Sequence, residues 1–164
     1  MSGNISKDEQ LRELVFDTTY LLPAFGVDVD VDTSKNIKLI LNELADVRGV
    51  KLIISDLSPL EGFLKSFRLA EKMKNEEGEK AAKMGFLAVT KDSTFSIVSH
   101  SDERTFNGAC EIRQNHRDPF DCFIFATARS INAPLVTEDI DAQKFLGKKK
   151  VLSWRNLKQY LSKL

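Results

Sequence analysis

Short apolar segments of strand length alternate with longer amphipathic segments along this chain, and this alternation limits the fold more than any other feature. Apolar residues at helical spacing are clearest at 34–49, 58–73, 102–115 and 118–131. Parallel sheets that are covered by helices on both faces have this alternating order. The expected fold class is α/β, a three-layer α/β/α sandwich with a mainly parallel sheet of about four to five strands. The strands are expected at 14–16, 52–54, 133–137 and 150–153.

Further segments complete the expected order of elements. Residues 93–99, STFSIVS, alternate between apolar and polar as a strand does. A helix is expected to begin after a turn near Gly78, and short helices are expected at 142–145 and 156–164. Gly49 suits the end of the helix over 34–49, because glycine readily adopts the left-handed conformation that ends helices.

The length of 164 residues predicts a single domain over 1–164 with one core. Its polar start, residues 1–10, is interpreted as a tail rather than a signal peptide, and no apolar run reaches the roughly 20 residues of a membrane span. Cys110 and Cys122 form no metal-ligand pattern and are expected to be reduced, mostly buried thiols. A soluble, cytoplasmic protein without a membrane partner is therefore expected.

The charge balance limits how the chain can bind nucleic acid. Lys and Arg number 24, as do Asp and Glu, so the formal net charge is zero. No bulk positive field attracts a polyanion, and such binding needs a local patch. Arg113 and Arg117 could clamp a phosphate, and the basic run 144–150 could follow a nucleic-acid backbone, although solvation explains these residues as well.

Carboxylates recur where the expected strands end or where the adjoining helices begin. Asp17 follows the first strand directly, and Asp139 follows the strand over 133–137 by one residue. Glu61 and Asp121 lie in the first turns of two helices. Ligands of parallel α/β sheets bind beyond the carboxyl ends of the strands. The fold prediction therefore brings these distant acids to one edge of the sheet.

Helix capping offers a simpler explanation for several of these acids. SPLE, Ser58 to Glu61, has the form of a capping box, and SKDE at 6–9 matches the box too. Asp118 suits the N-cap of the helix that Pro119 opens, with Asp121 favouring the helix dipole. Asp17 differs, because it lies among apolar residues where an unpaired carboxylate is costly, although it too could cap the next helix.

Several carboxylates in one crevice repel one another, and a divalent cation resolves that repulsion. Oxygen ligands without His or Cys favour Mg²⁺ or Mn²⁺ over zinc. His100 and His116 have no evident partner in the sequence, so neither is expected to be a ligand. The chemistry that needs such a site is phosphoryl transfer, in which the metal activates water and neutralises phosphate charge.

Four stretches of the chain then resemble a known family. VFDTTYLL, SPLEGFL, HRDPFDCFIFATA and PLVTEDID are similar, in order and spacing, to the four acidic motifs of PIN-domain ribonucleases. The nearest likeness is to the VapC-type toxin branch and related archaeal and bacterial PIN proteins. The resemblance runs from about Leu14 to the last helix.

The resemblance implies a metal-dependent endoribonuclease on a Rossmann-like fold, with RNA as substrate, an antitoxin protein as partner and a homodimer as assembly. It also implies that water attacks a phosphodiester and leaves a 5′-phosphate and a 3′-hydroxyl. Thr18 and Thr137 match hydroxyl positions that orient a carboxylate or water, and Asp118 and Asp141 would support the acids. The residues that it assigns to binding Mg²⁺ or Mn²⁺ are Asp17, Glu61, Asp121 and Asp139.

Some positions leave alternatives open. Asp56 competes with Glu61, and Glu138 and Asp141 flank Asp139. Residues 75–107 match no motif and are interpreted as an insertion that shapes the substrate groove or a partner surface. A PIN-like RNA-binding or scaffold protein without catalysis is the alternative function. A haloacid dehalogenase-type phosphatase is disfavoured because DTT replaces its D-x-D, and a dinucleotide-binding domain because no glycine-rich turn follows the first strand.

Overall fold

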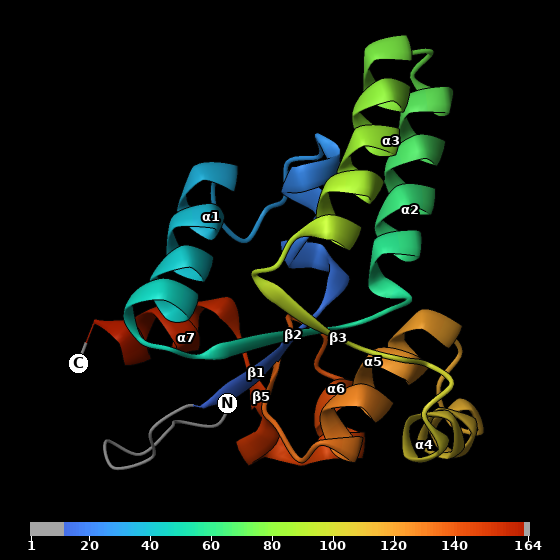
Figure 1. The fold of residues 1–164 in the computed structure, drawn as a ribbon. Helices are drawn as coiled ribbons and strands as arrows, with labels where there is room; N and C mark the ends of the chain where they lie inside the picture. Colours follow the sequence, from blue (N-terminus) through green and yellow to red (C-terminus); the bar gives the residue numbers. More distant parts are fainter. Residues whose placement is uncertain (1–11, 163–164) are drawn as a thin grey trace.

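A single parallel sheet forms the centre of the molecule (Figure 1). The computed structural model describes residues 12–162. Its strand order is β3-β2-β1-β4-β5, and every neighbouring pair is parallel. The predicted parallel sheet is therefore confirmed, including the strand expected at 93–99. The strands are β1 Glu13–Phe16, β2 Lys51–Ser55, β3 Phe95–Val98, β4 Leu135–Val136 and β5 Val151–Leu152.

Helices cover both faces of this sheet, which gives the predicted three layers. Strand residues alternate between the faces, so Leu14 and Phe16 join one buried cluster and Val15 the other. In Figure 1, α4, α5 and α6 gather on one side, while α2 and α3 rise as a hairpin beyond the sheet. The helices are α1 Ser34–Asn42, α2 Ser58–Lys72, α3 Glu76–Lys91, α4 Glu103–Arg113, α5 Pro119–Ser130, α6 Ala142–Leu146 and α7 Trp154–Leu161.

Four short helical segments join these elements: η1 Thr18–Tyr20, η2 Leu22–Phe25, η3 Glu43–Val47 and η4 Lys148–Lys150. Gly49 lies just after η3 with a φ of 64°, so it ends the helical segment as predicted. Within residues 12–162, no helix is long and apolar enough to cross a membrane.

The order of strands in the sheet reverses between β1 and β4. The chain moves from β1 outward to β2 and β3, and then returns to the other side of β1 to form β4 and β5. Phe16 of β1 pairs with Val136 of β4, so Asp17 and Thr137 follow neighbouring strand ends. Open parallel sheets bind ligands at such a switch point, outside the carboxyl ends of the strands. The switch point of the sheet, where a ligand crevice is expected, therefore coincides with the strand end that Asp17 follows.

Close packing around Phe25 sets the position of α2. A Cβ on Gly62 would lie 2.8 Å from the Phe25 ring, and a Cβ on Gly85 would lie 2.6 Å from the carbonyl oxygen of Ala24. Only glycine fits either position, so α2 and α3 approach η2 closely. This packing holds the first turn of α2 beside η1.

Several local predictions are wrong in detail. Helix α3 begins at Glu76, before Gly78, because the side chain of Asn75 caps it by accepting a hydrogen bond from the Gly78 backbone N–H. Ser58 does not cap α2; it lies inside the helix with a buried hydroxyl that has no hydrogen-bond partner. The Cys110 side chain is exposed, whereas Cys122 is buried and both are free thiols as expected.

Two further segments with roles predicted from the sequence are residues 6–9 and residues 75–107. The SKDE motif at 6–9 lies outside the described residues. Residues 75–107 form α3, β3 and the first part of α4, and β3 pairs with β2 over Leu52 to Ser55.

Candidate active site

Asp17 lies at the carboxyl end of β1 and is held by two hydrogen bonds. The Thr137 hydroxyl donates to its Oδ2 at 2.5 Å, and the Thr19 backbone N–H donates to its Oδ1 at 3.3 Å. The second bond makes Asp17 the N-cap of η1. One oxygen of Asp17 therefore caps a helix, as weighed from the sequence, while the other accepts a hydrogen bond from the neighbouring strand end.

Asp139 is positioned by the turn that follows β4. Its backbone N–H donates to the Thr137 hydroxyl oxygen at 3.0 Å, and its Oδ1 accepts from the backbone N–H of Asp141 at 2.8 Å. Thr137 thus links Asp17 and Asp139. The Asp141 carboxylate pairs with Lys144 at 2.6 Å and is directed to that lysine.

Glu61 is almost completely buried in the first turn of α2, with 2% of its surface exposed. Its Oε2 accepts a short hydrogen bond from the Thr18 hydroxyl, and Nζ of Lys65 lies 2.5 Å from its Oε1. That Oε1 atom has no hydrogen bond of acceptable geometry. The capping-box interpretation of Glu61 is therefore wrong, because its side chain faces η1 and not the start of its own helix.

Asp121 lies in the first turn of α5, which Asp118 caps as predicted. Asp118 accepts hydrogen bonds from the backbone N–H groups of Phe120, at 2.8 Å, and Asp121, at 3.4 Å. The Asp121 carboxylate is partly buried, and its Oδ2 lies 3.1 Å from Nε2 of His116. Asp118 therefore accepts hydrogen bonds from backbone N–H groups, whereas the Asp121 carboxylate contacts the His116 side chain.

The charge of these acids is incompletely compensated. Burial, together with the nearby carboxylates of Asp118, Asp17 and Glu61, raises the pKa of Asp121 to about 6, although the hydrogen bond with His116 lowers it. Burial also raises the pKa of Asp17, although the Thr137 hydroxyl opposes this. Burial lowers the pKa of Lys65, but its contact with Glu61 and the charges of Asp17 and Asp121 outweigh this and raise it overall.

The donor set fits a divalent cation. Oxygens of Glu61, Asp118 and Asp121 lie within 4.8 Å of one another, as do ligand atoms of His116, Asp121 and Asp139. The buried Oε1 of Glu61 has the Lys65 ammonium group as its charged neighbour, at 2.5 Å. Hard oxygen donors whose charge needs neutralising are what Mg²⁺ and Mn²⁺ prefer.

Two side chains of this site were missed in the sequence. His116 precedes the α5 cap and reaches the acid of the first turn, a contact that no spacing rule indicates. Lys65 follows Glu61 by four residues, and this Glu-to-Lys spacing on one helix face could have been recognised. The structure places six of the predicted site residues near one another: Asp17, Thr18, Glu61, Asp121, Thr137 and Asp139.

The competing acids lie elsewhere. Asp56 follows β2 and binds His100, through the backbone N–H and Nδ1, each at 2.8 Å. Glu138 faces away from Asp139, accepting hydrogen bonds from the Trp154 backbone N–H at 2.7 Å and the Tyr20 hydroxyl at 3.1 Å. Asp56 is therefore engaged at the neighbouring strand end, and Glu138 ties β4 to α7.

The arginines before α5 have separate environments. Arg113 donates to the His116 carbonyl oxygen at 2.9 Å and so braces the turn that leads to α5. Arg117 is exposed beside Asp118. In the basic run, Lys144 pairs with Asp141 and Lys150 donates to the Asn132 carbonyl oxygen.

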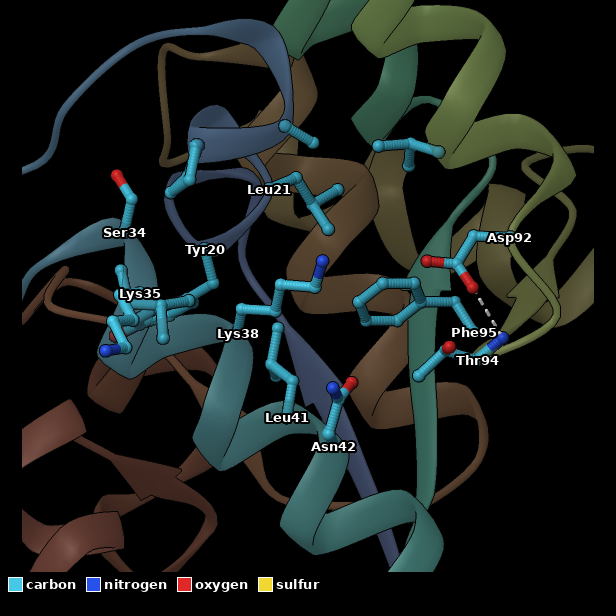
Figure 2. A pocket seen from close by; sticks show the side chains of 14 residues that line it. Tyr20, Leu21, Ser34, Lys35, Lys38, Leu41, Asn42, Asp92, Thr94 and Phe95 are labelled. Carbon is cyan, nitrogen blue, oxygen red and sulfur yellow. Dashed lines mark hydrogen bonds between the residues drawn. The ribbon is translucent and has the colours of Figure 1, made fainter.

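A separate cavity of about 560 Å³ lies between η1, η2, α1 and the end of α3 (Figure 2). Leu21, Leu41 and Phe95 give it a mostly apolar lining, and Lys38 extends across it. The acids described above do not line it. The cavity is therefore distinct from the acidic edge of the sheet.

The fold and the site together define a parallel α/β/α protein with carboxylates clustered at the switch point of its sheet. The family model of the PIN domain matches residues 14–147, most of the chain, and the chain belongs to the PIN domain family. No curated protein matches the sequence.

Solved structures share the fold at low sequence identity. A toxin-antitoxin complex from Klebsiella pneumoniae is 22% identical with a TM-score of 0.51, covering 85% of this chain and 95% of that one. VapBC2 from Rickettsia felis, bound to a promoter DNA fragment, is 19% identical with a TM-score of 0.57, covering 87% and 98%. VapC20 from Mycobacterium tuberculosis, a sarcin-ricin loop cleaving toxin, is 14% identical with a TM-score of 0.57, covering 80% and 93%.

Proposed function

We propose that this protein is a metal-dependent endoribonuclease that hydrolyses RNA phosphodiester bonds. The observation that carries the proposal is the convergence of Asp17, Glu61, Asp121 and Asp139 around incompletely compensated negative charge at the switch point of the sheet. Membership of the PIN domain family supports a nuclease, and the sarcin-ricin loop cleaving toxin VapC20 among its structural neighbours supports RNA as the substrate.

The four acids would hold Mg²⁺ or Mn²⁺, and the residues behind them fix their geometry. A bound divalent cation would activate water and neutralise charge on the scissile phosphate. Thr137 orients Asp17, and Thr18 orients Glu61, through the hydrogen bonds described above. Because these hydroxyls come from strand ends and η1, the carboxylates are preorganised before any ligand binds.

The reaction would be hydrolysis with water as nucleophile. A new bond forms between the water oxygen and phosphorus, and the bond from phosphorus to the 3′-oxygen breaks. The water loses a proton and the departing 3′-oxygen gains one, which leaves a 5′-phosphate and a 3′-hydroxyl. The exposed Arg117, beside the cap of α5, would contact a flanking phosphate, with a smaller contribution from Arg113.

Partners and location follow as further parts of this proposal. The structural neighbours from Klebsiella pneumoniae and Rickettsia felis are toxin-antitoxin assemblies, which supports an antitoxin protein as partner of this chain. A homodimer and a cytoplasmic location accord with a VapC-like toxin.

Cleavage of a generic labelled RNA tests the proposal. The purified protein is expected to cut it with Mn²⁺ or Mg²⁺, EDTA is expected to stop cleavage, and Asp17→Asn and Asp121→Asn are expected to reduce the rate at least about 100-fold. Asp102→Asn is the matched control, because Asp102 caps α4 through Thr105. Cleavage that persists in both site variants would contradict the assignment. RNA binding without cleavage, at any metal concentration, would favour a non-catalytic RNA-binding protein.

A further inference from the structure

We propose that His116 is a metal ligand of this site, acting with Asp121 and Asp139, and that its nitrogen makes the site prefer Mn²⁺ to Mg²⁺. The inference deepens the proposed function, because it concerns the same acidic edge, and it adds a nitrogen donor to a set otherwise made of oxygens. It also replaces the expectation that neither histidine is a ligand.

The His116 ring is held in one orientation by its surroundings. Its backbone N–H donates to the Ile112 carbonyl oxygen at 3.0 Å, and its own carbonyl oxygen accepts from Arg113. The ring packs against Phe125 and Phe145, with centroids 5.4 and 5.8 Å away. Only 12% of the side chain is exposed. The imidazole is therefore preorganised and shielded, unlike a solvated surface histidine.

The ring directs Nε2 at the acids. Nε2 lies 3.1 Å from Oδ2 of Asp121, and a ligand atom of Asp139 lies within 4.8 Å of both residues' ligand atoms. Nitrogen and oxygen ligands lie about 2.0–2.2 Å from a first-row transition metal, so ligand atoms around one ion are separated by up to about 4.4 Å. Small side-chain rotations, with release to solvent of the proton that Nε2 donates to Asp121, would therefore bring all three ligand atoms onto one ion.

The imidazole nitrogen of His116 is expected to determine which metal, Mn²⁺ or Mg²⁺, the site prefers. Imidazole is a borderline donor that suits transition metals, whereas Mg²⁺ prefers oxygen ligands and retains its waters. A site made of carboxylates alone discriminates little between Mg²⁺ and Mn²⁺. One imidazole in the set favours Mn²⁺ selectively, so removing it is expected to weaken Mn²⁺ binding more than Mg²⁺ binding.

The matched control is His100. It also pairs with an aspartate at 2.8 Å, but its side chain is 48% exposed and its partner is Asp56. His100→Gln therefore removes a histidine–aspartate pair of the same chemistry from outside the proposed metal site.

Calorimetric titration with Mn²⁺ and with Mg²⁺ compares the wild type, His116→Gln and His100→Gln. We expect His116→Gln to lose about 10-fold or more in Mn²⁺ affinity and less than about 3-fold in Mg²⁺ affinity, and His100→Gln to match the wild type. Equal losses for both metals, or none, would overturn the proposal.

Pulsed electron paramagnetic resonance of the Mn²⁺-loaded wild type gives a readout that does not depend on the folding of a variant. A ¹⁴N coupling typical of a directly bound imidazole is expected in the wild type and in His100→Gln. Its absence from the wild type, or a failure of the wild type to bind Mn²⁺, would overturn the inference. RNA cleavage that still requires Asp17 and Asp121 would then leave the proposed nuclease function standing.

Discussion

The Thr137 hydroxyl donates a 2.5 Å hydrogen bond to Oδ2 of Asp17, and this bond joins the ends of the two strands between which the sheet reverses its order. The same hydroxyl oxygen accepts from the backbone N–H of Asp139. One side chain therefore fixes the relative position of two acids that lie more than a hundred residues apart in the sequence.

Replacing Thr137 by valine is expected to weaken metal binding while preserving the fold, because valine keeps the shape and loses the hydroxyl. A hydrogen bond to a charged group contributes about 1.5–3 kcal/mol, which corresponds to roughly 10- to 100-fold in Mn²⁺ or Mg²⁺ affinity. Calorimetry measures this loss. Thr137→Ser keeps the hydroxyl and should bind metal nearly as the wild type does; an equal loss in both variants would contradict the role of the hydrogen bond.

The pKa of Asp121 predicts how stability depends on pH in EDTA. Between its ordinary value of 3.8 and about 6, the folded carboxyl holds a proton that the unfolded chain has released. The free energy of unfolding therefore falls as pH rises through this window. Asp121→Asn removes this dependence and is expected to stabilise the metal-free protein at pH 7 by about 1–3 kcal/mol.

Thermal unfolding at pH 4.5 and pH 7 checks this prediction. The melting temperature of Asp121→Asn should exceed that of the wild type at pH 7 by roughly 2–4 °C per kcal/mol, and the difference should shrink at pH 4.5. A difference that is the same at both pH values would show that the carboxyl does not titrate in this range.

Lys65 is expected to compete with the metal, since its ammonium group lies beside Oε1 of the buried Glu61. Lys65→Met leaves Glu61 without this counter-charge, so the protein in EDTA should lose about 1–2 kcal/mol of stability, less than for a fully buried pair because Lys65 is 55% exposed. The increase in melting temperature on adding Mn²⁺ should be larger than in the wild type.

The control for Lys65 is Lys80→Met. Lys80 pairs with Glu77 on the exposed surface of α3, and such pairs contribute about 0–1 kcal/mol. A response to Mn²⁺ that is unchanged in Lys65→Met would contradict competition between the lysine and the metal.

Gly85→Ala is expected to destabilise the protein by about 1–3 kcal/mol or more, because the added methyl group would meet the backbone of Ala24 and Phe25 at 2.6 and 2.7 Å. Gly108→Ala in α4 is the comparison, since its nearest neighbour is the flexible end of Arg129 at 3.1 Å. Chemical denaturation of the two variants separates them. Similar stabilities would show that η2 can move away from α3.

Much of the fold followed from periodicity in the sequence. The runs that became β1 and β2 are buried and apolar, and the acids that follow strands were located by one rule about the edges of parallel sheets. Strand β4 is only two residues long, yet the apolar pair Leu135–Val136 before Thr137 was sufficient to place Asp139. Local pattern and general topology together predicted the gathering of these acids.

The remaining features depended on contacts that local pattern does not encode. Ser58 and Glu61 have the spacing of a capping box, but the Thr18 hydroxyl and Lys65 direct Glu61 elsewhere. The orientation of His116 is set by Phe125 and Phe145, which lie far enough along the chain that only tertiary packing brings the three rings together. Side-chain partners that come from other elements were therefore invisible before the fold was known.

Residues 137–139 face two ways, and this has a consequence for the end of the chain. Thr137 and Asp139 serve the acidic edge, while Glu138 between them binds the first residue of α7, whose Trp154 ring stacks on Tyr20 at 5.0 Å. Helix α7 lies beyond the 14–147 match to the PIN family. A chain shortened after Gly147 would keep every proposed ligand, but it would lose the contact of α7 with Glu138 and the pairing of β5 with β4 and Thr137, both of which position residues 137–139.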